Sequence, residues 1–179
     1  VRVSPERRGH TDRKSDILGT SGVRVGGTDF DKYIDLRTVM PHLGFGSKLA
    51  QKNMEPPVWW FHDLATWRQI NFMYDPRMAT DIRRVKRDAL EPEKFDRLLG
   101  VIEARKGHAL LAAVEQAKIA LSEAELTVLG NLGLAAVPDL ELTRGQLEEA
   151  ISSSVERVVA RLNATLGDAG VDASEIDAV

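Results

Sequence analysis

Apolar and polar positions alternate along the chain in patterns typical of a mixed α/β protein. The clearest pattern lies in residues 144–166, where apolar side chains recur every three or four positions and predict one long amphipathic helix. Thr143 and Gln146 precede it with the spacing of a capping box, and we expect Gly167 to end it. The apolar stripe consists of Leu147, Ile151, Val155, Val158, Leu162 and Leu166.

Other helices are predicted upstream of this one. Apolar side chains at helical spacing follow Thr28 and Asp29, and the acidic first turn suits the positive end of a helix dipole. Pro92 is typical of the first turn of a later helix. The predicted helical regions are 28–43, a short basic helix at 78–90, and 91–122 with a joint near Gly107.

Strand patterns occur at both ends of the chain and before the long helix. Residues 1–27 are predicted to form a charged hairpin, and residues 176–179 a final buried strand. A second strand pair is expected at 125–130 and 136–142, joined by a glycine-containing turn. Because both ends resemble interrupted strands, we expect the sequence to be a piece of a larger protein.

Aromatic side chains concentrate in a segment that shows little other pattern. Residues 48–80 are rich in proline breaks and include a run with three tryptophans. We interpret the run as a small aromatic core rather than a ligand platform. The predicted core members are Trp59, Trp60, Trp67, Leu98, Leu99 and Leu110.

Composition narrows the class of protein. The 179 residues are 43% hydrophobic and carry a net charge of −3, which fits one domain or two small lobes and does not favour nucleic-acid binding. Cysteine is absent, so disulfides and thiolate metal sites are excluded. No apolar run approaches the roughly 20 residues that span a bilayer, so no membrane partner is expected. These features fit a cytoplasmic protein.

The segment GVRVGGTDFD holds the first candidate binding feature. Gly26 and Gly27 separate a strand-like run from the helix signal at Thr28. Glycines let a backbone turn sharply or approach a ligand closely. The segment matches neither a Walker loop nor a GxGxxG fingerprint, so a plain turn remains the alternative interpretation.

The segment VEQAKIALS holds the second candidate. Glu115, Lys118 and Ser122 are spaced i, i+3 and i+7, which places them along one face of a helix. A carboxylate, an ammonium and a hydroxyl can together hold a ribose and the edge of a base. The alternative is a solvent-facing Glu–Lys pair.

Other polar groups suggest no chemistry. The four histidines show no metal-ligand spacing, and no Ser/His/Asp arrangement is present, so we expect neither a metal site nor a catalytic residue. A basic cluster at 83–87 is flanked by acidic residues and is interpreted as a solvated face. If it bound nucleic acid instead, the affinity would fall steeply with salt.

The order of these segments resembles the second half of the ATPase domain of the seventy-kilodalton heat-shock chaperones, the DnaK type. The resemblance rests on GGTDFD, EQAKIALS and LTRGQLEEAI, and it spans essentially the whole chain. The segments LGTSGVRVGGTDFD and MPHLGFG are most similar to a divergent bacterial branch of chaperone-like proteins. The resemblance implies an α/β fold: an actin-like ATPase lobe II fragment with its inserted subdomain.

The resemblance also implies three segments. Residues 1–43 would be the hairpin and first helix of the lobe core, residues 44–142 the inserted subdomain, and residues 143–179 the capped helix and final strand of the core. The two core helices would then lie against strands from residues 1–25 and 176–179.

Several residues take roles from the family pattern. Glu115 and Lys118 match residues that bind the adenosine ribose, and Ser122 matches a serine near the adenine. Ile119 stands where the main family has an arginine that stacks on adenine, so this chain lacks that cation.

The glycine turn would face those residues. Gly26 and Gly27 would form the opposite wall of the adenosine pocket. Thr28 stands where the main family has an acidic residue. The phosphates would lie elsewhere, away from the acidic first turn of the helix.

The resemblance predicts part of an ATP-binding molecular chaperone of the stress response, with ATP or ADP and Mg bound in the full-length protein and none expected on this piece. Client or co-chaperone proteins would be the partners. Whether the parent is an ATPase stays open, and the piece alone is not expected to be active. The alternative is a non-catalytic interaction module that keeps the actin-like fold and has lost the nucleotide.

Overall fold

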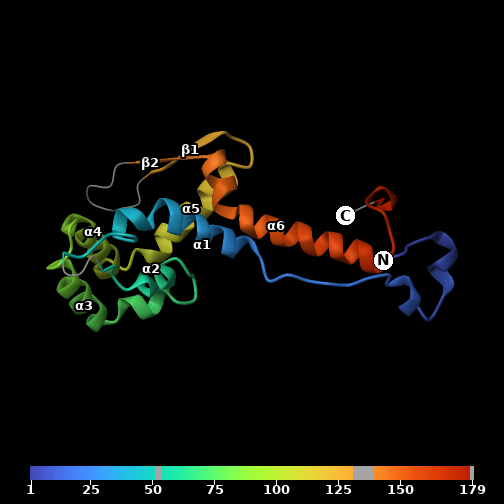
Figure 1. Cartoon of the computed structure of the whole chain (residues 1–179), viewed down its shortest axis with the longest axis horizontal. Helices are drawn as coiled ribbons and strands as arrows, with labels where there is room; N and C mark the ends of the chain where they lie inside the picture. Colours follow the sequence, from blue (N-terminus) through green and yellow to red (C-terminus); the bar gives the residue numbers. More distant parts are fainter. Residues whose placement is uncertain (51–53, 131–138, 178–179) are drawn as a thin grey trace. The chain divides into compact units, whose positions relative to one another are not determined.

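The chain is mainly helical, with one two-stranded antiparallel sheet, in a computed structural model that describes residues 1–50, 54–130 and 139–177 (Figure 1). It divides into two compact units. One comprises Val1–Val25 with Ser152–Val179, and the other comprises Gly26–Ile151. The predicted mixture of helices and strands is thus confirmed.

The unit Gly26–Ile151 contains most of the regular structure. Its predicted joint near Gly107 is confirmed, because Ala104 to Lys106 separate two helices there. Helix α6 begins in this unit and extends beyond Ile151. The elements are α1 Gly27–Thr38, η3 Met40–Leu43, α2 Val58–Leu64, η4 Ile70–Tyr74, α3 Pro76–Lys86, α4 Pro92–Glu103, α5 Gly107–Ala120, β1 Leu126–Leu129, β2 Leu140–Thr143 and α6 Arg144–Ala169.

Local signals account for the beginning of α6. The backbone N–H of Thr143 donates to Gln146 Oε1 at 2.9 Å, and the Gln146 N–H donates to Thr143 Oγ1 at 3.2 Å, so the capping box is confirmed. The predicted end at Gly167 is wrong. The helix continues to Ala169 and ends at Gly170, whose φ of +62° is the left-handed conformation that favours glycine.

The strand pair is confirmed. Strands β1 and β2 are antiparallel, and their register pairs Leu126 with Thr143 and Leu129 with Leu140. The predicted turn between them lies outside the described residues. Leu129 and Leu142 are buried and join the hydrophobic core, so the sheet is packed on one face and exposed on the other.

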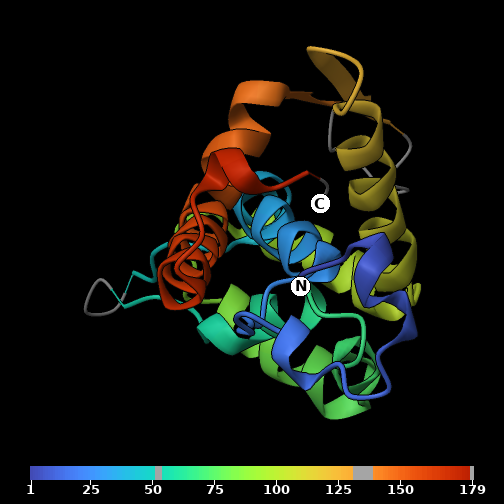
Figure 2. The same ribbon diagram turned by 90° about the vertical axis from the view of Figure 1, so that its right-hand side faces the viewer.

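The core of this unit lies among its helices. Helix α1 packs against α5 and α3 against α4, an arrangement that Figure 1 and Figure 2 show from two sides. Trp60, Leu98, Leu99 and Leu110 are buried as predicted. The largest fully buried side chains are Phe61, Phe95, Ile34, Met40, Leu43, Leu64, Ile70, Met73, Ile82, Leu98, Leu110 and Leu111.

Two of the predicted aromatic core members lie elsewhere. Trp59 is 51% exposed, because it precedes Trp60 on the short helix α2 and points about 100° away from the buried face. Trp67 is half-buried, and its ring packs against His108 with 5.7 Å between centroids. The aromatic cluster therefore extends to the surface of the unit.

The predicted hairpin in residues 1–27 is wrong, and the described part of the predicted final strand, Ile176 and Asp177, has no strand structure. Residues 1–25 contain two short 3-10 helices, η1 Pro5–Gly9 and η2 Lys14–Asp16. Near the other end, η5 Ala173–Glu175 is followed by Ile176 and Asp177 without strand structure, and residues 178–179 lie outside the description. The two core helices therefore pack against no strand from these segments in the described structure.

In residues 1–25, the buried carboxylate of Asp16 binds two arginines of the same segment. Asp16 is 2% exposed and forms ion pairs with Arg13 and with Arg7, whose Nε lies 2.6 Å from Asp16 Oδ1. The hydrogen bond from Arg13 is the main reason that the pKa of Asp16 is lowered. Within the same unit, Ser21 and Thr165 share a hydrogen bond that ties the N-terminal segment to α6.

Gly107 provides a test of the packing. An added Cβ at Gly107 would lie 2.9 Å from side-chain atoms of Ile70, Leu64 and Tyr74, closer than van der Waals contact allows. We expect Gly107→Ala to lower the free energy of unfolding by about 1–3 kcal/mol in urea titrations.

Gly100 is the matched control. It lies inside α4, and an added Cβ there meets no atom within 4 Å. Gly100→Ala should therefore raise the free energy of unfolding by about 0.5–1 kcal/mol. Equal effects of the two substitutions would show that α5 does not begin against Ile70 and Tyr74.

Candidate functional site

The glycine pair forms the start of α1. Gly26 is the N-cap, with extended backbone (φ −142°, ψ 175°), and Gly27 is the first helical residue. Asp29 Oδ2 accepts a hydrogen bond from the Gly26 N–H at 2.8 Å. Neither glycine has positive φ, so the turn requires no left-handed residue. Thr28, the next residue, is exposed.

The second candidate segment lies at the end of α5. Glu115 and Lys118 are half-buried on the helix, and Ile119 is 52% exposed. Ser122 lies just beyond the last helical residue, and its hydroxyl donates to the Lys118 carbonyl at 3.5 Å. Among the described residues, Glu115 has no hydrogen-bond or ion-pair partner for its carboxylate.

Lys118 joins the two segments. Its Nζ lies 2.6 Å from Asp31 Oδ1 and donates to the Gly27 carbonyl oxygen at 3.4 Å. An added Cβ on Gly27 would lie 3.6 Å from the same Nζ. The structure therefore brings Lys118 to the glycine turn. Within the described part of the chain, neither Glu115 nor Ser122 contacts that turn, and their roles stay predictions.

Two buried carboxyl groups of α1 were not singled out as site residues from the sequence. Asp31 is 1% exposed and is held by the ion pair with Lys118. Asp35 follows one turn later, is fully buried, and neither of its carboxyl oxygens has a hydrogen-bond partner among the described residues. Their sequence spacing could have indicated this burial. Asp31 and Asp35 are four positions apart, and each directly follows an apolar residue, Phe30 or Ile34, so all four lie on one face of the helix.

Burial changes the chemistry of Asp35. Removal from water disfavours the carboxylate and raises the pKa of Asp35 well above its ordinary value, and the neighbouring charge of Asp31 raises it further. Asp35 is therefore the group of this interface that most favours its neutral form, while Asp31 is matched by the Lys118 ammonium.

Arg144, the first residue of α6, fixes the end of α5. Its Nε donates to the Leu121 carbonyl at 2.9 Å and its guanidinium also donates to the Ala124 carbonyl at 3.1 Å. Its Nη1 lies 2.8 Å from Glu125 Oε1. These bonds satisfy carbonyls that a helix end leaves unpaired, and they hold the loop that contains Ser122.

Two half-buried histidines and the metal-ligand types complete the polar groups considered as site candidates. Burial is the main reason that the pKa values of His42 and His62 are lowered. Among the residues that the structure describes, no group of three or more potential metal ligands occurs. Within the same described part, no helix combines the length and apolar character needed to cross a bilayer.

Residues 100–179 match the family model of the Hsp70 protein. The match includes α5, both strands and the capped helix α6, which hold two of the three sequence segments behind the resemblance. Through this part the chain is similar to the Hsp70 family, and over these residues the resemblance seen in the sequence is confirmed. No solved structure matches the chain.

The ion pair between Asp31 and Lys118 can be tested by stability. Lys118→Met keeps the aliphatic stem but leaves the buried Asp31 carboxylate without a cation, so we expect the free energy of unfolding to fall by about 3 kcal/mol. Adding Asp31→Asn removes the uncompensated charge and should restore more than half of that loss. Urea denaturation measures both. Lys32→Met on α1 is the control and should change stability by about 0.5 kcal/mol or less.

The burial of Asp35 should make the stability of the protein depend on pH. Because its pKa is raised in the folded state, the folded protein binds the extra proton, and stability falls as pH rises from the ordinary value of 3.8 through the folded pKa. Asp35→Asn removes this loss, so its Tm relative to the wild type should increase from pH 4 toward pH 8.

Thermal unfolding across that pH range measures the difference. Asp88→Asn, at an exposed position, provides the control and should show no such trend. A constant difference between Asp35→Asn and the wild type would contradict the burial of Asp35.

Proposed function

We propose that this chain contributes the adenosine-side wall of the nucleotide cleft in an ATP-binding, chaperone-like protein of the Hsp70 family. The observation that carries the proposal is the contact of Lys118 with the Gly27 carbonyl, which joins two motif segments 91 positions apart. The family match over residues 100–179 supports it, because the Glu115–Ser122 segment lies inside that range. The divergent bacterial branch and a cytoplasmic location are parts of the same proposal.

The residues present fit an adenosine only in part. The unpartnered, half-buried Glu115 carboxylate is suited to accept hydrogen bonds from ribose hydroxyls. Lys118 is already used by Asp31 and Gly27, which leaves its ammonium at most one further donor. Ile119 offers apolar contact to a base, and the exposed Ser122 hydroxyl offers a donor.

Phosphates and Mg are not expected at this wall. The carboxylates of Asp29 and Asp31 lie in the first helical turns of α1, where they oppose a bound phosphate. Nucleotide affinity of the described wall alone should therefore be weak, since tight sites need enclosure and several convergent polar groups. Clients or co-chaperones would respond to a nucleotide that other parts of the protein hold.

A second candidate function is a non-catalytic interaction module. The ion pair between Lys118 and Asp31 favours it, because the ammonium that would bind ribose already has a buried structural role. The aliphatic Ile119 favours it as well. In this case the family fold would serve contacts with other proteins, with no nucleotide.

A gain of affinity discriminates between the two functions. Ile119→Arg supplies a planar cation that can stack on an adenine, and we expect it to strengthen adenosine binding by about tenfold if the wall is an adenosine wall. Glu115→Gln should weaken binding by about tenfold through the loss of a charged acceptor. Methyl chemical-shift titration with adenosine measures both variants on the full chain.

Ala109→Arg is the matched control. Position 109 is exposed near the beginning of α5, so it adds the same charge to the same helix far from the glycine turn. It should leave adenosine binding unchanged. No response to adenosine in the wild type and in Ile119→Arg alike would favour the interaction module.

A further inference from the structure

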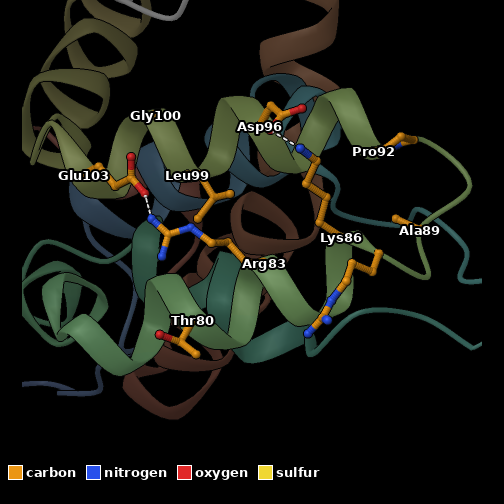
Figure 3. A pocket seen from close by; sticks show the side chains of 10 residues that line it. Thr80, Arg83, Lys86, Ala89, Pro92, Asp96, Leu99, Gly100 and Glu103 are labelled. Atoms are coloured by element: carbon orange, nitrogen blue, oxygen red, sulfur yellow. Dashed lines mark hydrogen bonds and ion pairs between the residues drawn. The ribbon is translucent and has the colours of Figure 1, made fainter.

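A groove of about 990 Å³ lies between α3 and α4, away from the glycine turn and from α5 (Figure 3). All the residues that line it belong to one unit and to the described part of the chain. They are Thr80, Arg83, Lys86, Arg87, Ala89, Pro92, Asp96, Leu99, Gly100 and Glu103.

The two walls of the groove have opposite charge. Helix α3 supplies Arg83 and Lys86, which face the carboxylates of Glu103 and Asp96 on α4 (Figure 3). The Arg83–Glu103 pair is about half exposed (57% and 49%), whereas Lys86 is 33% and Asp96 58% exposed. Exposed pairs of this kind contribute little net stability, so another carboxylate can replace either one at low cost.

A third cation lines the same wall. Arg87 follows directly after α3, is exposed, and has no hydrogen-bond or ion-pair partner among the described residues. Lys86 and Arg87 follow Arg83 by three and four positions, the spacing at which helical side chains lie about 5–6 Å apart at Cβ. The groove therefore offers three cations to two carboxylates.

Part of the groove lining is apolar and locally open. Leu99 and Ala89 line it, and Gly100 faces space that no side chain fills, because an added Cβ would meet nothing within 4 Å. An apolar side chain of a ligand would find both contact and room beside Gly100.

We propose that this groove binds an acidic peptide segment of a partner protein. The ion pairs with Glu103 and Asp96 show that Arg83 and Lys86 can bind carboxylates at these positions. A ligand with glutamates at short intervals would exchange with those two groups, engage Arg87, and place an apolar side chain at Leu99 and Gly100.

The observations favour a peptide over a nucleic acid or another polyanion. The two carboxylates in the groove repel closely spaced phosphates, and the chain as a whole carries a net charge of −3. The cations are spread along the end of α3 and the residue after it rather than converging on one point. This arrangement suits carboxylates spaced along a peptide.

Fluorescence anisotropy of the full chain tests the proposal. The probe is a labelled peptide of about twelve residues in which pairs of glutamates alternate with single leucines, and the comparison peptide has glutamines in place of the glutamates. We expect saturable binding of the acidic peptide alone, weakened at least about fivefold between about 50 mM and about 300 mM salt.

Variants locate the binding to the groove. Arg87→Ala should weaken binding about fivefold, whereas Arg84→Ala removes the same charge from the outer side of α3 and should have no effect. Glu103→Gln and Asp96→Asn free the competing cations and should each strengthen binding.

Gly100→Leu adds a test that leaves the charge unchanged, because its side chain occupies the open space in the groove lining beside Gly100. It should abolish binding while the protein stays folded, as circular dichroism would verify. Equal weakening by Arg84→Ala and Arg87→Ala, tighter binding of a single-stranded RNA of about twelve nucleotides than of the peptide, or no binding of the peptide would each overturn the proposal.

Discussion

The geometry of the candidate site depends on the ion pair between Lys118 and Asp31. Hydrophobic packing alone tolerates small shifts of one helix along another, but a shift of one turn, about 5.4 Å, would leave the buried Asp31 without a cation. The pair therefore fixes the register of α5 on α1 and places the glycine turn beside Lys118. The same contact uses two of the three hydrogen-bond donors of the Lys118 ammonium.

The sequence predicted correctly those features that depend only on residues close together in the chain. The capping box at Thr143 and the joint before Gly107 depend on neighbours in sequence, and both were predicted correctly. The first 25 residues were predicted wrongly because alternating valines indicate a strand only if a partner strand is available. There Asp16 binds two arginines, and the segment forms short 3-10 helices instead.

The candidate site was predictable only through its motifs. Spacing placed Glu115 and Lys118 on one face of a helix, but the contact with Gly27 bridges 91 positions, and only the family resemblance indicated it. Asp31 was read as a partner of the helix dipole, since acidic residues are common in a first turn. Its burial depends on how α1 packs against α5, which the periodicity of α1 alone does not specify.

The two proposed binding surfaces can vary independently. The Glu115–Ser122 segment, β1, β2 and α6 lie within residues 100–179, which match the Hsp70 family, whereas α3 and most of α4 precede that range. Long-range coupling requires an element with two arrangements that both sites bias. Lys118 is fixed by Asp31, while the ion pairs of the groove are exposed and exchangeable. A change in the groove's ion pairs therefore leaves intact the register that positions Lys118.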